Sequence, residues 1–230
     1  MKNELIKPSG LVKSTDRRLF LKRGTMSVAA AGLLMIGCND DEQIPMNPAV
    51  SLGSGDIGIL NYAYALEQLE AAFYAAVITG SYYANANAEE KQIMADLEKH
   101  ERAHRDFFKA ALGTAAIEDL EINFSSIDFG SRNSVLGAAK TFEDLGVAAY
   151  NGAGKFLVSA DLLLIAGKIV SVEARHAAAI RDLINPGSAD FAGDDLIDVN
   201  GLERTLSFSQ VLTAASAYVI TPLDFSQLPS

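Results

Sequence analysis

The chain has 230 residues, of which 49% are hydrophobic, enough to form the core of one domain with additional segments. It carries 29 acidic and 19 basic side chains, a formal net charge of −10, which argues against binding nucleic acid or anionic lipid through basic patches. Cys38 is the only cysteine, so no intramolecular disulfide can form.

The first 37 residues have the features of an export signal and are set apart from the fold. Arg17 and Arg18, followed by a Phe-Leu-Lys sequence, resemble a twin-arginine motif. The apolar run 25–37 is too short to span a bilayer as a mature helix, and it ends directly before Cys38, as in a bacterial lipobox. We therefore expect export, with a lipid on Cys38 that anchors the chain to a membrane in the periplasm or at the cell surface. An ordinary secretory signal with a chance Gly-Cys pair is the alternative.

The remaining sequence predicts an all-α fold, because apolar residues recur every three or four positions and no strand pattern competes with this period. The predicted helices cover residues 56–79, 88–112, 133–157 and 160–184. The long stretch between the second and third helices suits a crossover along a four-helix bundle. The expected parts, in chain order, are the export signal 1–37, a tether 38–55, the four-helix bundle 56–185, and a partly helical extension 186–230 that packs on the bundle.

An internal repeat relates the first and third predicted helices. Residues 65–74 (ALEQLEAAFY) align with residues 141–150 (TFEDLGVAAY), which places Glu67 on Glu143. The helices that follow keep the same spacing, since thirteen residues separate the start of each from a Glu-x-x-His motif. The sequence therefore predicts two similar helical hairpins that face each other across a pseudo-twofold axis.

The two Glu-x-x-His motifs are Glu101 with His104 and Glu173 with His176, and i, i+3 spacing places each pair on one helix face. One such pair is weak evidence, but two, each preceded by a helix with an inward Glu, match the ligand set of dimetal carboxylate bundles. We expect two metal ions, because two divalent cations neutralise four buried carboxylates. Oxygen and imidazole donors suit iron or manganese, with zinc not excluded. The candidate ligands are Glu67 and His104 for one ion, Glu143 and His176 for the other, and Glu101 and Glu173 as bridges.

Several neighbouring residues have less certain roles. Glu70 lies three residues after Glu67 and is an alternative or supporting ligand, although its repeat mate is a glycine. His100 is expected to point away from the bundle into solvent. Tyr74 and Tyr150, two turns after the inward Glu residues, either hydrogen-bond a ligand, carry a transient electron, or only pack in the core with a satisfied hydroxyl. The apolar positions expected to form core are Phe73, Phe107, Leu163 and Ile169.

Four segments carry a resemblance to a known superfamily: LNYAYALEQLEAAFY, EKHERAHRDFF, TFEDLGVAAY and VEARHAAAIRDL, all within residues 56–185. They resemble the ferritin-like superfamily, and more narrowly the exported ferritin-like domain proteins that include plant desiccation-related proteins. This resemblance implies a four-helix bundle with a dinuclear iron or manganese centre. It implies no single activity, because the superfamily includes storage proteins, peroxidases, catalases and oxygenases.

The leading functional hypothesis is a membrane-tethered dimetal protein that reacts with peroxide or dioxygen in stress protection. The chain has no Cys-x-x-Cys pair for an electron-transfer iron, so a peroxidase of this kind would need an external electron donor. Two alternatives remain open at this point: a metal-binding or storage protein without turnover, and an envelope scaffold protein. A homo-oligomer is compatible with each of them.

Overall fold

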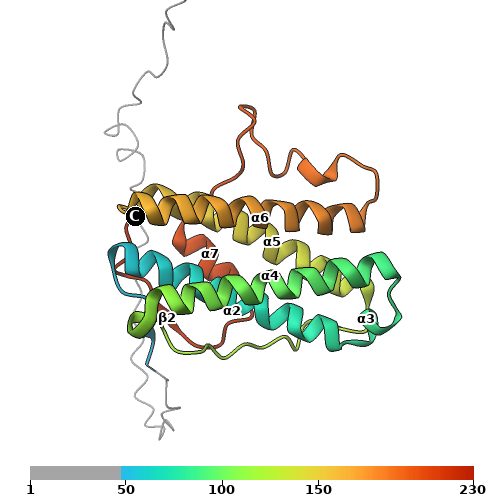
Figure 1. Cartoon of the computed structure of the whole chain (residues 1–230), viewed down its shortest axis with the longest axis horizontal. Helices are drawn as coiled ribbons and strands as arrows, with labels where there is room; N and C mark the ends of the chain where they lie inside the picture. Colours follow the sequence, from blue (N-terminus) through green and yellow to red (C-terminus); the bar gives the residue numbers. More distant parts are fainter. Residues whose placement is uncertain (1–47) are drawn as a thin grey trace, which may run out of the picture. The chain divides into compact units, whose positions relative to one another are not determined.

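The computed structural model describes residues 48–230, so the expected export signal, Cys38 and most of the tether lie outside the described residues. The described part is helical, with a two-residue parallel pairing of β1 (Val50–Ser51) and β2 (Leu223–Asp224). The main helices are α2 (Gly55–Thr79), α4 (Ala88–Leu112), α5 (Arg132–Ala153) and α6 (Ala160–Ile184), with the shorter α3 (Ser81–Asn85) and α7 (Phe208–Ala215) (Figure 1). The predicted all-α class is confirmed.

Local sequence signals explain where three of the long helices begin. The side chain of Asn87 accepts a hydrogen bond from the Glu90 backbone at the start of α4, and Ser131 and Ser159 cap α5 and α6 in the same way. Such caps satisfy backbone N–H groups that have no partner within the helix. At the end of α4, Gly113 has a φ of 55°, which a residue with a side chain rarely adopts.

The third helix ends at Ala153, earlier than the predicted position near residue 157. A short 3₁₀ turn, Gly154–Phe156, follows it. The carboxylate of Asp56 then accepts hydrogen bonds from the backbone N–H groups of Val158 and Ser159, at 2.8 and 2.9 Å. The chain turns there because these bonds tie the linker to the first turn of α2.

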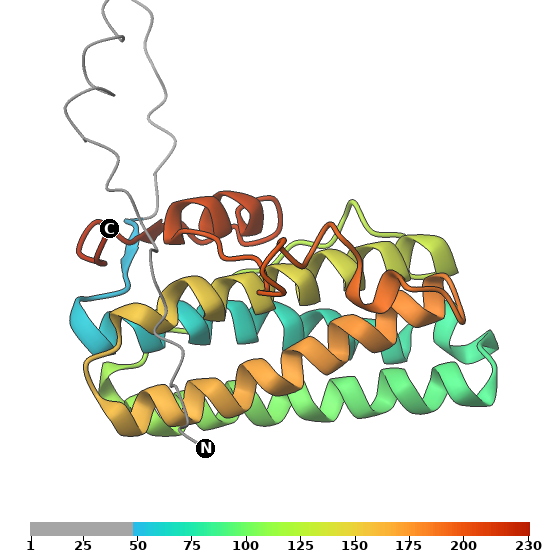
Figure 2. The ribbon, with the colours of Figure 1, turned by 90° about the horizontal axis from the view of Figure 1, so that it is seen from above.

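The four long helices form two antiparallel hairpins, α2 with α4 and α5 with α6, and Figures 1 and 2 show the hairpins lying along one another. The crossover 113–131 connects them, as the sequence predicts. Buried Asn61 of α2 fixes the start of this crossover, because its amide donates to Ala115 O at 2.9 Å and accepts from Ile117 N at 3.0 Å. The crossover is therefore held by the bundle itself and returns the chain to the far end.

The C-terminal extension is attached to the bundle at both polar and apolar contacts. Arg181 of α6 is buried and bonds both Asp144 of α5 and Asp195 of the extension. Phe208 of α7 packs edge-on against Tyr62, with ring centroids 4.7 Å apart. The backbone of the extension passes so close to Gly152 that a Cβ atom there would lie 1.9 Å from Leu206 O, so only glycine fits at that position.

The core lies between the four long helices, and two of the four apolar residues expected in it are elsewhere. Phe73 and Ile169 are buried, as expected. Phe107 and Leu163 are 38% and 47% exposed, so the expectation that they form core is wrong. Both lie near the end of the bundle where α4 stops and α6 starts. Among residues 48–230, no helix is both long and apolar enough to cross a membrane.

Candidate metal centre

The six candidate ligands meet in the middle of the bundle, and each long helix contributes at least one of them. Glu67 comes from α2 and Glu143 from α5, while α4 and α6 each contribute a Glu-x-x-His pair. The four glutamates have no exposed surface. The pairs converge because i, i+3 spacing turns both side chains of a motif to the same helix face, and that face is the interior of the bundle.

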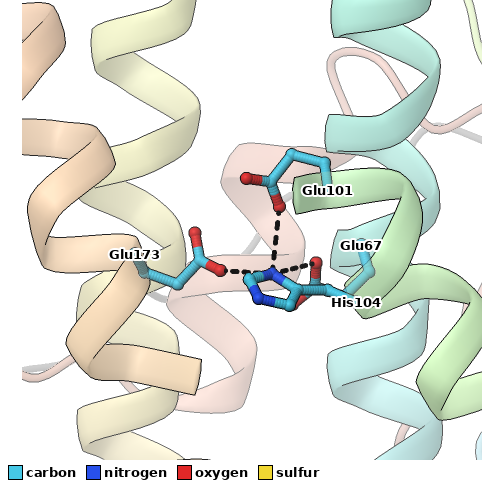
Figure 3. A group of neighbouring side chains, drawn as sticks. All are labelled: Glu67, Glu101, His104 and Glu173. Atoms are coloured by element: carbon cyan, nitrogen blue, oxygen red, sulfur yellow. Dashed lines mark ion pairs between the residues drawn. The ribbon is translucent and has the colours of Figure 1, made fainter. Parts of the chain in front are cut away.

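One group of donor atoms surrounds the Nδ1 atom of His104 (Figure 3). This nitrogen lies 2.8 Å from Glu173 Oε1, 3.4 Å from Glu101 Oε2 and 3.5 Å from Glu67 Oε2. The three oxygens come from three helices, and the imidazole is mostly buried, with 14% of its side chain exposed. One N–H group cannot serve three acceptors, so the arrangement leaves lone pairs directed at a common point.

A second group surrounds the Nδ1 atom of His176 with nearly the same distances. Glu101 Oε1 lies at 2.7 Å, Glu173 Oε2 at 3.4 Å and Glu143 Oε2 at 3.5 Å. Glu101 and Glu173 therefore belong to both groups, with one oxygen directed to each. Within each group, the donor atoms lie within 4.8 Å of one another.

Most of these donor atoms lack a hydrogen-bond partner, although several lie close together. Both oxygens of Glu101 and Glu173, one oxygen each of Glu67 and Glu143, and both His Nδ1 atoms are buried without an aligned partner. Buried polar groups are nearly always bonded, and a lone buried carboxylate costs several kcal/mol. Eight unsatisfied atoms at one place fit a metal ion, since they are the ligand types that iron and manganese take.

Two tyrosines link the hairpins at the outer glutamates. Tyr74 of α2 donates its hydroxyl proton to Glu143 Oε1, and Tyr150 of α5 donates to Glu67 Oε1. Each tyrosine therefore bonds the glutamate of the opposite hairpin, and the two bonds join equivalent positions of the internal repeat. Of the roles left open by the sequence, the structure shows hydrogen bonding to the candidate ligands by two buried tyrosines. These bonds orient each glutamate and leave its other oxygen directed to the centre.

The charges and the burial of the cluster shift the pKa values of its histidines and glutamates. Burial alone would lower the pKa of His104 and His176, but the surrounding glutamates raise it to about 12 in each case. Burial acts to raise the pKa of Glu101, yet the two imidazoles hold it at about 2. For Glu143, burial and the nearby glutamates outweigh His176 and raise the pKa to about 8. Without metal, the cluster is therefore neutralised in part by protons, which a bound cation would displace.

Glu70 is a fifth buried carboxylate beside the cluster, but it belongs to neither donor group. Burial raises its pKa well above the usual value of 4.5, and the charges of Glu173, Glu101 and other glutamates act in the same direction. The side chain faces Gly146 of α5, where a Cβ atom would lie 3.0 Å from Glu70 Oε1. The glycine at this repeat position thus makes room for the carboxyl group of the opposite hairpin.

His100 has a contact that the sequence analysis did not anticipate. It is exposed, but the expectation that it points away from the bundle is wrong. Its ring stacks on that of His176, with centroids 5.2 Å apart, and its Nδ1 atom lies 3.0 Å from His176 Nε2. The signal was present in the sequence, since i, i+4 spacing places His100 and His104 on the same side of α4.

The fold and the cluster together define the class: a four-helix bundle with a buried Glu/His cluster that could hold a metal ion. Comparison with protein-family models supports this class directly, because the model described as "Ferritin-like domain" matches residues 55–186. The chain belongs to this ferritin-like family. A search among curated proteins finds no match.

Proposed function

We propose that the chain binds two iron or manganese ions and reacts with peroxide or dioxygen. Glu67 and His104 would hold one ion, Glu143 and His176 the other, and Glu101 and Glu173 would bridge them. The observation that carries this proposal is the pair of overlapping donor groups, which share the two central glutamates and leave eight buried atoms without hydrogen-bond partners.

Charge balance favours two cations over one. Four ionised glutamates in a dry interior repel one another, and two imidazolium groups offset only half of their charge. Two divalent ions would neutralise all four and allow both imidazoles to bind through unprotonated Nδ1. Zinc fits the donor set less well than iron or manganese, because oxygen donors outnumber imidazole here.

The surrounding residues are suited to a reaction with an oxygen-containing oxidant. When bound, iron or manganese ions would supply the one- or two-electron chemistry. Tyr74 and Tyr150 hold the outer glutamates in place through their hydroxyl groups. Burial beside the cluster favours the protonated form of Glu70, so this carboxyl group is placed to donate a proton to substrate oxygen. Electrons would come from an external donor, and His100 offers an exposed group in contact with His176 for this purpose.

The proposed setting is the periplasm or the cell surface, with a lipid on Cys38 that anchors the chain to a membrane. Its support is the sequence alone, namely the paired arginines, the apolar run 25–37 and the cysteine that follows it. Mass spectrometry of the purified mature chain should find a diacylglyceryl-modified cysteine as the first residue. A chain with Cys38→Ser should appear in the soluble fraction, and an unmodified cysteine in the wild type would refute the anchor.

Metal stoichiometry tests the central proposal. The metal-free chain is loaded anaerobically with Fe(II) or Mn(II), and bound metal per chain is measured before peroxide or oxygen is added. We expect two ions per chain, a change in the absorption spectrum and consumption of the oxidant. Glu101→Gln should lower the metal content. Glu90→Gln is the matched control, because Glu90 is also a buried glutamate of α4 but pairs with Arg132 outside the cluster.

Three outcomes of this experiment separate the alternatives. Two ions with no consumption of either oxidant would leave a binding protein without turnover. Uptake of many ions per chain would indicate storage. Equal metal content in wild type and Glu101→Gln would refute the site and favour a scaffold role.

A further inference from the structure

The imidazole of His176 is contacted on both of its nitrogens by consecutive residues of α4. On the inner side, Glu101 Oε1 lies 2.7 Å from His176 Nδ1. On the outer side, the Nδ1 atom of His100 lies 3.0 Å from His176 Nε2. The side chain of His176 is 5% exposed, so water has little access to its nitrogens. One helix therefore fixes the orientation of a ring that belongs to the opposite hairpin.

The inner contacts of His176 decide which nitrogen donates in the outer contact. Its Nδ1 atom faces three carboxylate oxygens at 2.7 to 3.5 Å, so this nitrogen is the one available to a cation. A neutral imidazole that binds a cation through one nitrogen carries its proton on the other. Nε2 of His176 therefore donates a hydrogen bond to Nδ1 of His100, which keeps its own proton on Nε2.

A hydrogen-bond acceptor behind a metal-binding imidazole acts on the metal through that imidazole. It selects the tautomer that leaves the other nitrogen free for the cation, and it holds the ring in one orientation. It also raises the basicity of the nitrogen that binds the cation. Replacing such an acceptor typically lowers metal affinity about 10- to 100-fold.

The internal repeat supplies no equivalent acceptor for His104. Glu101 aligns with Glu173, so the residues directly before them occupy the same repeat position. These residues are His100 in α4 and Val172 in α6, and a valine side chain has no hydrogen-bonding group. Figure 3 shows the second ring nitrogen of His104 directed away from the three glutamates around its Nδ1 atom. The two donor groups thus have equivalent ligands but differ at this position behind the imidazole.

We propose that His100 is a positioning residue that makes the two metal sites unequal. Through its hydrogen bond to His176, it tightens binding of the ion held by His176 and Glu143, so that this ion is bound first. The inference rests on the proposed metal pair and adds to it an order of loading and a residue outside the six ligands. The alternative is a contact that only joins α4 to α6, which would not depend on a hydrogen-bond acceptor.

Three substitutions separate the hydrogen bond from packing. His100→Asn keeps an acceptor, because the amide oxygen is attached to Cγ as the imidazole Nδ1 is. His100→Phe keeps a planar ring beside His176 but has no acceptor. Lys99→Phe is the matched control, since Lys99 is an exposed neighbour on the same helix that pairs with Asp96. His100 is itself exposed, so none of these changes opens the core.

Stepwise metal binding measures the effect. The metal-free chain is titrated with Mn(II) against a competing chelator, and two dissociation constants are determined. We expect two unequal steps in wild type and the Lys99→Phe control, with His100→Asn close to them. In His100→Phe, the tighter step should weaken about tenfold or more, while the weaker step changes little. Equal weakening in His100→Asn and His100→Phe would show a packing contact and overturn the proposal.

A gain of affinity at the other site provides a test that misfolding cannot imitate. Val172→His places an imidazole at the repeat position equivalent to His100, and the donor distances around His104 and His176 agree within 0.1 Å. The weaker step should therefore tighten several-fold and approach the other. If the weaker step does not tighten, the inequality of the two sites has another cause.

Nitrogen NMR locates the proton of His176 directly. The zinc-loaded chain is diamagnetic, and its three histidines give few imidazole signals to assign. We expect the proton on Nε2 in wild type and in His100→Asn, and a proton on Nδ1 would overturn the proposal. A wild-type chain that binds no metal would refute the proposed function. Two ions bound with equal constants, and unchanged in His100→Phe, would refute this inference alone.

Discussion

Replacing Glu143 by Gln tests whether burial of this carboxyl group lowers the stability of the metal-free chain at neutral pH. Glu143 is fully buried, and its Oε1 atom accepts a hydrogen bond from Tyr74. Burial and the charges of neighbouring glutamates outweigh His176 and raise its pKa to about 8. Glutamine keeps the acceptor oxygen and nearly the same shape but cannot ionise. The variant therefore removes the titration of this side chain with little change in packing.

The sign and the size of the expected change in unfolding free energy follow from proton linkage. A carboxyl with a raised pKa in the folded state contributes stability that is complete below pH 4.5 and is lost as the pH rises through 8. Each pKa unit corresponds to about 1.4 kcal/mol, so wild type loses about 3 kcal/mol by pH 7 and about 5 kcal/mol above pH 8. The metal-free Gln variant avoids this loss. At pH 5 the difference is below about 1 kcal/mol.

Urea unfolding of the metal-free proteins, followed by circular dichroism at pH 5 and pH 7, measures the difference. Glu118→Gln is the control, because Glu118 is an exposed glutamate in the crossover. We expect Glu143→Gln to be more stable than wild type at pH 7 only, and to bind fewer metal ions. A variant that is no more stable at pH 7, or equally stabilised at both pH values, would refute this account of the cluster.

Three further changes have defined outcomes. Tyr150→Phe should weaken metal binding about tenfold or more by freeing the glutamate that it orients, measured by competition with a chelator. Gly146→Ala should destabilise the chain by about 1–3 kcal/mol in thermal unfolding, and adding Glu70→Ala should restore the loss, because the new Cβ meets that carboxyl. Arg181→Met should remove the ion pair that ties Asp195 of the extension to α6, so that limited proteolysis within residues 188–204 becomes faster than in wild type.

The helical class and the meeting of the six candidate ligands could be anticipated because both depend on short-range periodicity. Helical spacing fixes which residues share a face, and the internal repeat adds the register between the two hairpins. Glu67 and Glu143 occupy equivalent positions in the structure, each bonded by the tyrosine of the other hairpin. These hydrogen bonds between the hairpins could not be predicted from either helix alone, because they depend on how the hairpins cross.

Other features depend on tertiary packing that periodicity does not encode. Phe107 and Leu163 have the spacing of core residues, yet both are exposed near the end of the bundle where α4 stops and α6 starts. His100 shares a face with His104, but its stacking on His176 requires the particular distance between α4 and α6. The helix α5 ends before its predicted position for a similar reason. The carboxylate of Asp56 accepts a hydrogen bond from the backbone of the α5–α6 linker, and the chain turns there.

The pseudo-twofold symmetry of the centre fails at two places, and both bear on function. Glu70 has no counterpart in the second hairpin, where Gly146 provides the space for it. The Nε2 atom of His176 lies 3.0 Å from the Nδ1 atom of His100, whereas His104 has no histidine within hydrogen-bond distance among the described residues. A cage that only holds cations gains nothing from a buried acid on one side, because an extra carboxyl raises the cost of burying charge. A reaction that delivers protons to one side of a bound oxidant does require such an asymmetry, and this favours the redox proposal over storage.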